Sequence, residues 1–217
     1  MLISGLSLKG SPILSPSDFS SNATIINFDN LTGGNCNLCG PSVTDQYSSL
    51  GVIFNNPSDP GQDTADTNLT ASFPNASSPN LLFVDQGGLL ADAPAQPFQI
   101  LFSVPVTEVG FDFGSSSYSY IELDAYGAGH QLLETLDFLG TPAPIGLAGF
   151  VGLEESSPIV ELDVSYHPFY DPCRTFNFSI DNLGFEGSTP EPPTFALILT
   201  GVLVTAFGRR RYGAPQG

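Results

Sequence analysis

The chain has 217 residues, with 22 acidic side chains against 5 basic ones and a formal charge of −17. This balance argues against a nucleic-acid binder, which needs Lys and Arg to contact phosphates. Only 12% of the residues are charged whereas 41% are hydrophobic, so the chain has enough apolar material for a folded core. Abundant Gly, Pro and Phe favour many short strands joined by turns over a helical bundle.

The N-terminus, from Met1 to Gly10, makes a poor secretory signal peptide. Its apolar run is short, no basic residue precedes that run, and Lys9 follows it instead. Either the true start lies further upstream or export uses a weak signal. We therefore expect residues 1–18 to be poorly ordered, as the remnant of a signal peptide.

Hydrophobic residues alternate with polar ones through much of the chain from residue 19 to residue 187. The alternating segments are 98–104, 109–113, 121–126, 160–165 and 176–181, with turns rich in Gly, Pro and Ser between them. Such alternation is typical of antiparallel strands with one face in a core. We predict an all-β domain over residues 19–187, an antiparallel two-sheet sandwich of jelly-roll type. Residues 55–80 form the one long polar stretch and are expected to be a loop.

Asp29 and Asp181 each stand in an Asp-Asn-Leu triplet, near the first and the last predicted strand. The first and last strands of a jelly roll can lie side by side, which would bring the two carboxylates together. The apolar phase also slips between Ile180 and Leu183, as a β-bulge would cause. Carboxylate and carbonyl oxygens suit Ca²⁺, so Asp29 and Asp181 are candidate ligands of a structural calcium ion. The alternative is that both Asp-Asn pairs form turns at strand ends.

The chain has three cysteines, of which Cys36 and Cys39 form a CxxC pair and Cys173 stands apart. Three thiols do not complete a four-thiolate zinc site, and a redox role would need a βαβ context. In an exported protein we expect a disulfide, either Cys36 to Cys39 or one of these to Cys173.

No catalytic motif stands out, and we expect the protein not to be an enzyme. There is no nucleophile elbow, zinc-protease helix or phosphate-binding loop. His130 and His167 are expected in exposed loops, and Glu154 with Glu155 in a solvated turn. Tyrosines are candidates for stacking on sugar rings, with packing on the sheet as the favoured alternative; they are Tyr118, Tyr120, Tyr126, Tyr166 and Tyr170.

The C-terminal residues differ from the acidic body. Residues 188–193 are a Pro-rich linker, and no charge occurs from Pro193 to Gly208, before Arg209, Arg210 and Arg211. A membrane-spanning helix needs roughly 20 apolar residues, and arginine side chains can extend a shorter one. We predict a single hydrophobic transmembrane helix within residues 194–217, with the arginines in the cytoplasm. The alternative is a buried C-terminal core element.

This tail resembles the PEP-CTERM sorting signal of Gram-negative bacteria, in which a Pro-Glu-Pro motif precedes a hydrophobic span and an arginine cluster. The resemblance implies that an exosortase, a membrane-embedded cysteine protease-like enzyme, processes the chain near the motif. Pro190, Glu191 and Pro192 would then be recognition residues of a substrate, with Arg209, Arg210 and Arg211 completing the signal. A GPI signal, the other terminal hydrophobic signal considered, lacks the arginine cluster.

The body also resembles a recurring ectodomain found ahead of PEP-CTERM tails. The resemblance rests on Ile26 to Leu31, Gln46 to Phe54, Val109 to Gly114 and Phe178 to Glu186. It implies a β-sandwich similar to carbohydrate-binding modules, many of which hold a structural calcium ion near the first and last strands. We therefore expect an exported, non-catalytic protein, anchored in the inner membrane in transit and then delivered to the outer surface or extracellular matrix. The alternative function is a carbohydrate-binding, lectin-like module with polysaccharide as its partner.

Overall fold

The computed structural model describes residues 11–32, 42–57, 64–66, 76–85, 96–115, 119–142, 147–168 and 177–187. Contacts divide the chain into one compact unit, Met1–Gly187, and a second unit, Ser188–Gly217. The expected linker at 188–193 and sorting segment at 194–217, with the predicted hydrophobic helix, lie outside the described residues. Within the described ranges, no helix has the length and apolar character to cross a membrane.

The described part of the chain is all-β and antiparallel, as the alternating pattern predicts. Its strands form one continuous sheet in the order β4-β5-β11-β6-β10-β7-β8, with β1 and β9 paired to β10, β2 to β11 and β3 to β6. The strands are β1 (Ser11–Ile13), β2 (Thr24–Ile26), β3 (Val52–Asn55), β4 (Thr64–Asp66), β5 (Leu81–Asp85), β6 (Phe98–Ser115), β7 (Ser119–Gly127), β8 (Gln131–Phe138), β9 (Thr141–Pro142), β10 (Leu147–Pro168) and β11 (Asn177–Gly187). Two short 3-10 helices, η1 (Pro16–Asp18) and η2 (Ser48–Leu50), complete the described elements.

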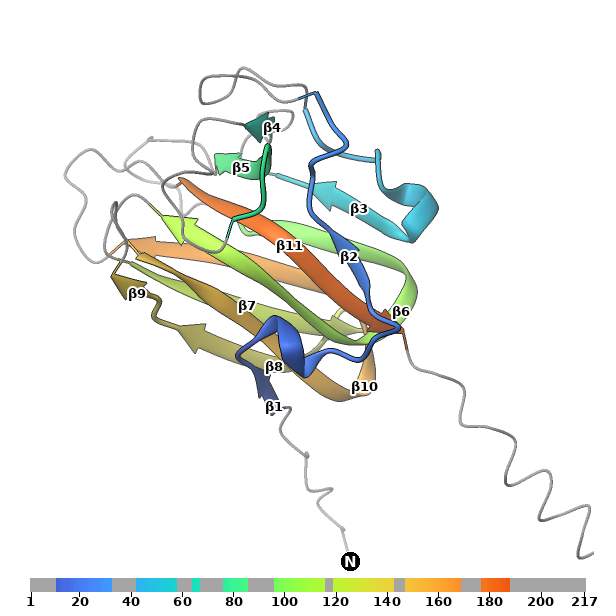
Figure 1. Ribbon diagram of the computed structural model, residues 1–217. Helices are drawn as coiled ribbons and strands as arrows, with labels where there is room; N and C mark the ends of the chain where they lie inside the picture. Colours follow the sequence, from blue (N-terminus) through green and yellow to red (C-terminus); the bar gives the residue numbers. More distant parts are fainter. Residues whose placement is uncertain are drawn as a thin grey trace, which may run out of the picture. The chain divides into compact units, whose positions relative to one another are not determined.

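Strands β6 and β10 bend, and this bend folds the sheet into two layers (Figure 1). Their register shifts between Glu154 and Glu161 of β10, and Pro158 lies in this interval. Proline cannot donate to a strand ladder, and a bulge bends the strand that carries it. Layer 1 contains residues 109–115 of β6 and 147–154 of β10, with β1, β2, β4, β5, β9 and β11. Layer 2 contains residues 98–106 of β6 and 159–168 of β10, with β3, β7 and β8.

Aromatic rings from the two layers meet in a common core. Phe178 of layer 1 lies 6.2 Å, between ring centroids, from both Phe98 and Tyr166 of layer 2. Phe113 of layer 1 contacts Phe138 of layer 2 at 5.6 Å. Each fully buried aromatic side chain stabilises the fold by about 1.5–3 kcal/mol. The fold is consistent with a sandwich, and its jelly-roll type stays a prediction.

Two expectations from the sequence differ from the structure. Residues 11–18, expected to be poorly ordered, form β1 and η1, and β1 pairs with β10 at Glu154 to Gly152. A capping box at Ser15 and Asp18 fixes η1 in place. The polar stretch 55–80, expected to be a loop, contains β4, which pairs with β5. Local hydrophobicity did not reveal either segment because β1 and β4 have only three residues each, which are held by pairing with β10 in one case and with β5 in the other.

The segment from β1 through η1 to β2 crosses the outer face of layer 1, from β10 to β11 (Figure 1). A row of three glycines, Gly152, Gly110 and Gly184, lies in register across β10, β6 and β11 beneath it. A Cβ atom at Gly184 would lie 2.8 Å from the Phe19 ring, and one at Gly110 would lie 3.0 Å from the Phe150 ring. The missing side chains therefore allow two aromatic rings to pack directly against the sheet.

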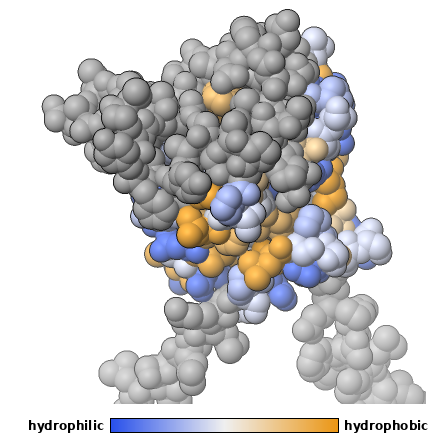
Figure 2. Space-filling model, turned by 60° about the vertical axis from the view of Figure 1, so that its left-hand side comes forward, coloured by the Kyte–Doolittle hydropathy of each residue, from blue (hydrophilic) through white to orange (hydrophobic). Residues whose placement is uncertain are grey.

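Several apolar side chains remain exposed among the described residues, including Ile25 at 50% and Val104 at 65%. Figure 2 shows one side of the described part, on which apolar side chains lie between hydrophilic ones. Single exposed apolar residues are normal in soluble domains. Ile25 lies on the segment that crosses layer 1, next to the glycine row.

Candidate functional site

The structure brings the two predicted calcium ligands to one place. β2 pairs with β11, with Ile26 opposite Leu183, so the first predicted strand does lie beside the last. The predicted bulge is confirmed by a register shift between Asp181 and Gly184, where Asn182 adopts a φ of 47°. Asp181 lies at the start of this bulge and is only 2% exposed.

Hydrogen bonds from one segment hold both carboxylates. Asp181 accepts from the backbone amide and the hydroxyl of Ser77. Asp29 accepts from the backbone amide of Asn80 at 2.9 Å. The side chain of Asn80 in turn donates to the carbonyls of Phe28 and Leu31. These hydrogen bonds connect the loop after β2, the segment before β5 and the last strand.

Burial makes the ionised form of Asp181 costly. Desolvation raises the pKa of this carboxyl from 3.8 to about 6, against the lowering effect of the hydrogen bonds from Ser77 and Asn182, and the charge of Asp29 raises it further. Burial and the same two carboxylates raise the pKa of Tyr47 to about 12. The site therefore concentrates negative charge in a poorly solvated place.

The donor set fits a structural cation only in part. Asp29, Asp181 and the buried Oδ1 of Asn80, which has no hydrogen-bond donor, offer oxygen ligands of the kind that Ca²⁺ prefers. N–H and O–H groups already contact the carboxylate oxygens, however, and hold them without a cation. The described residues contain no group of three or more His, Cys, Asp or Glu side chains suited to a metal ion. Calcium at this site stays a prediction.

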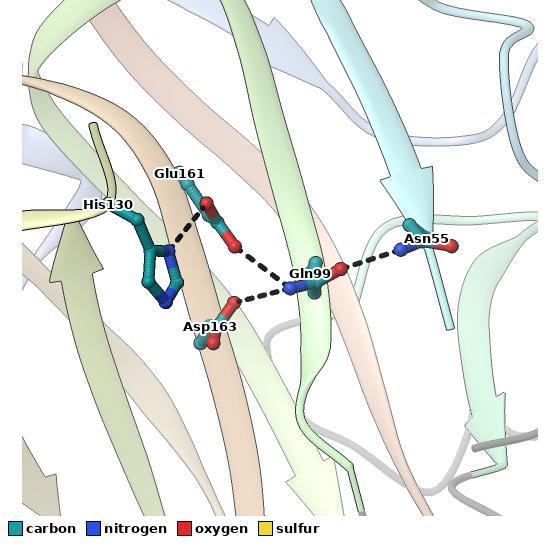
Figure 3. A network of polar contacts seen from close by, with 5 residues as sticks. All are labelled: Asn55, Gln99, His130, Glu161 and Asp163. Carbon is teal, nitrogen blue, oxygen red and sulfur yellow. Dashed lines mark hydrogen bonds and ion pairs between the residues drawn. The ribbon is translucent and has the colours of Figure 1, made fainter. Parts of the chain in front are cut away.

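A second polar constellation covers the outer face of layer 2, and sequence reasoning did not find it (Figure 3). Gln99 of β6 donates through Nε2 to Glu161 Oε1 at 2.8 Å and to Asp163 Oδ1 at 3.3 Å. Asn55 of β3 donates to Gln99 Oε1 at 2.6 Å, and His130 Nδ1 lies 3.2 Å from Glu161 Oε2. We call this set the polar face; its residues are Asn55, Gln99, His130, Glu161, Asp163 and Tyr126.

Cross-strand register explains why these side chains meet. Gln99 lies opposite Asp163 between β6 and β10, and Asn55 lies opposite Gln99 between β3 and β6. Residues directly opposite each other point to the same side of a sheet. The alternating pattern of β10 predicts that Glu161 and Asp163 point to the same side of the sheet. It does not predict which residues of other strands contact them.

Two tyrosine–histidine stacks occur on this side of layer 2. Tyr126 stacks on His130 with ring centroids 4.1 Å apart and planes at 7°. Tyr120 stacks on His167 at 4.5 Å and 8°, and His167 Nε2 lies 3.6 Å from Glu122 Oε1. Each stack thus pairs an aromatic ring with an imidazole that faces a carboxylate.

Asp163 is the most strongly perturbed group of the polar face. Burial raises its pKa from 3.8 to about 6, with a further increase from the charge of Glu161, while the Gln99 amide opposes the shift. The side chain is 6% exposed. A buried carboxylate beside a second carboxylate is a pattern found at functional sites and also in structural networks.

The other predicted site residues do not join either constellation. Tyr166 is 3% exposed and packs on Phe178, so the packing interpretation holds for this residue. His167 lies within β10 rather than in an exposed loop. Glu155, expected in a solvated turn, is 5% exposed at the bend of β10, where burial and then Glu134 raise its pKa. The residues outside the described ranges are Cys36, Cys39, Cys173, Tyr118, Tyr170, Pro190, Glu191, Pro192, Arg209, Arg210 and Arg211.

The sequence matches no protein-family model and no curated protein. Among solved structures, the chain is similar to the K2 cleaved adhesin domain of Lys-gingipain, with a TM-score of 0.42, 9% identity, and coverage of 75% of this chain and 98% of that one. It is also similar to the isomalto-dextranase of Arthrobacter globiformis T6 in complex with panose, with a TM-score of 0.35 and 13% identity over 81% of this chain. The chain spans about a third of that protein, at 34% of its length. These likenesses concern the fold alone.

Proposed function

We propose that the chain is an exported, non-catalytic surface or matrix protein, processed through a C-terminal PEP-CTERM signal. The observation that carries this proposal is the order of the tail: Pro190-Glu191-Pro192, an uncharged span, then Arg209 to Arg211. The arginines follow the positive-inside rule and leave the acidic body outside the cytoplasm. The partners are an exosortase-type processing enzyme and, through the hydrophobic segment, the inner membrane.

Substitution of the arginine cluster tests the proposed sorting signal. Replacing Arg209, Arg210 and Arg211 with Gln removes the orienting charge and is expected to disturb membrane orientation and C-terminal processing. The mass of the protein recovered from the cell surface reports both trimmed ends at once. Replacing Arg174, a basic residue of the body, with Gln is the matched control. Unchanged cleavage and localisation of the triple variant would argue against the sorting signal.

A second candidate function, glycan binding, is favoured by the polar face of layer 2. Sugar hydroxyls can donate to Glu161 and accept from the side-chain amide of Asn55, which is in an exposed position. Tyr126 offers an apolar ring with a polar tip beside these groups. All residues of the face except His130, which lies in the turn between β7 and β8, belong to paired strands, so most of its polar groups are positioned before a ligand arrives.

Binding to the extracellular polysaccharide of the producing organism tests this candidate. We expect the full chain to be retained by that polysaccharide and the Tyr126→Ala and Gln99→Ala variants to lose retention. Leu14→Ser, which changes an exposed residue of the segment beside layer 1, should be retained like the parent chain. Equal retention of all four proteins would rule out the polar face as the binding surface.

A further inference from the structure

A hollow of about 510 Å³ lies on the outer face of layer 1, beneath the segment that crosses this layer. The described residues that line it are Pro16, Phe19, Ile25, Asp112, Phe150 and Asn182. Small-molecule sites typically enclose roughly 300–1,000 Å³ and combine apolar walls with a few polar groups. The hollow therefore has the size of a small-ligand site, and it is separate from the polar face of layer 2.

Strand register places one buried carboxylate in the lining of this hollow. Asp112 of β6 lies directly opposite Phe150 of β10, so the two side chains share a face of the sheet. Asp112 is 6% exposed, and Asn182 Nδ2 donates to its Oδ2 at 3.0 Å. The β11 bulge at Asn182 supplies this amide. Within the lining, the Asp112 carboxylate thus stands next to one fixed amide, and Asp181 lies opposite Asp112 between β11 and β6.

The walls of the hollow are apolar. Phe19 and Phe150 meet edge to face with ring centroids 6.1 Å apart. Ile25 of β2 contributes a half-exposed side chain. The glycine row lets both phenylalanine rings lie close to the sheet, as described above. A ligand in the hollow would therefore place an apolar body against Phe19, Phe150 and Ile25.

The negative charge around the hollow favours a cationic ligand. The described residues contain no Lys or Arg, so none of them offers a permanent cation to a bound anion. On the same face, Glu108 lies in register with Glu154 on one side and Glu186 on the other. A carboxylate among apolar walls binds a cation more strongly than a neutral group, and an ammonium group is also attracted to aromatic rings.

We propose that this hollow binds a small organic ammonium compound with an apolar body. The ammonium group is held by the Asp112 carboxylate, and the apolar part packs against Phe19, Phe150 and Ile25. No part of this proposal rests on the proposed sorting or glycan-binding function.

Calorimetric titration of the purified full chain with three matched probes tests the proposal. The probes are 2-phenylethylamine, which is an ammonium ion at neutral pH, the neutral 2-phenylethanol and the anionic 3-phenylpropionate. We expect the amine to bind at least about tenfold more tightly than the alcohol, because the charge-assisted hydrogen bond is stronger than a neutral one. The carboxylate probe should not bind.

Variants locate the site. Asp112→Asn keeps the side-chain shape and should weaken amine binding about 30-fold, as expected when a buried charge partner is lost. Ile25→Trp fills the hollow from a half-exposed position and should also abolish binding. Val104→Trp, at a 65% exposed residue outside the lining, should leave binding unchanged. If Asp112→Asn fails to fold by circular dichroism, the Ile25→Trp and Val104→Trp pair decides alone.

Three results would overturn the proposal: equal affinity for the amine and the alcohol, tighter binding of 3-phenylpropionate than of the amine, or amine binding that Ile25→Trp leaves intact. The Gln99→Ala variant of the polar face should bind the amine like the parent chain. Loss of polysaccharide retention in that variant, with amine binding kept, separates the two proposed ligand sites.

Discussion

Asp181 accepts hydrogen bonds from both the backbone amide and the hydroxyl of Ser77, a residue 104 positions away in the chain. This contact fastens the segment before β5 to the bulge of β11. Because the carboxylate is almost fully buried, three donated hydrogen bonds do not offset its desolvation, and its pKa stays near 6. Because the contact with Ser77 involves a buried carboxylate with a raised pKa, the stability of the folded domain is expected to depend on pH.

Stability is expected to fall as pH rises from about 4 to about 6. The pKa values of Asp181 and Asp163 are both raised from 3.8 to about 6 on folding, so the folded state binds these protons more tightly than the unfolded state. Each shift contributes on the order of 2 kcal/mol, present at pH 4 and lost above pH 6. Thermal unfolding at a series of pH values measures how the stability of the domain changes with pH.

Asp163→Asn should raise the unfolding temperature at pH 7 and leave it unchanged at pH 4, because the amide has no proton to lose. Asn at this position keeps an oxygen for the Gln99 amide. Asp45→Asn, at an exposed carboxylate, is the matched control and should behave like the parent chain. A parent protein equally stable at pH 4 and pH 7 would contradict the expected linkage.

Calcium is expected to stabilise the domain through Asp29 and Asp181. Burial is the main cause of the raised pKa of Asp181, and the charge of Asp29 adds to it. A divalent cation between the two carboxylates would offset both effects, and a ligand that binds only the folded state raises the unfolding temperature. Differential scanning calorimetry in calcium chloride and in EDTA measures the difference. Asp29→Asn should abolish it and Asp45→Asn should keep it. Identical melting curves in both buffers would contradict calcium binding at Asp29 and Asp181.

The glycine row should tolerate no side chain at Gly152, its member on β10. A Cβ atom at Gly152 would overlap the carbonyl oxygen of Val109 and the Cα atom of Gly110, both of them backbone atoms that cannot rotate away. We expect Gly152→Ala to destabilise the domain by roughly 1–3 kcal/mol, the usual cost of overpacking. Gly187→Ala, where the nearest atom is 3.8 Å away, is the control for chemical denaturation. Equal loss of stability in both variants would argue against the close approach of β6 and β10.

Glu108 is expected to weaken the domain at neutral pH. It faces Glu154 and Glu186 in register, and its pKa is raised by burial and then by these two neighbours. Like charges directly opposite each other destabilise a sheet by roughly 0.2–1 kcal/mol. Glu108→Gln should therefore raise the unfolding temperature at low salt, with a smaller gain at high salt because ions screen the repulsion. A gain that does not depend on salt would point to packing instead of charge.

The strand pattern could be predicted from the amino-acid sequence, because alternation is a local property. Ile121, Leu123 and Ala125 are buried while Glu122 and Asp124 are partly exposed, as their spacing predicts. The sequence also located the bulge near Asp181, because an extra residue shifts the apolar phase. The proximity of Asp29 and Asp181 could be predicted because the first and last strands of a jelly roll can lie side by side.

Local sequence patterns do not indicate which strands are neighbours, and both proposed ligand surfaces depend on these pairings. Gln99 meets Asp163, and Asp112 meets Phe150, through pairings between β6 and β10 that no local pattern encodes. The N-terminal segment looked unstructured because its few strand residues gain stability only against β10 and β11. Cross-strand register is set by the packing of the whole core, and for this reason short-range sequence patterns do not reveal these sites.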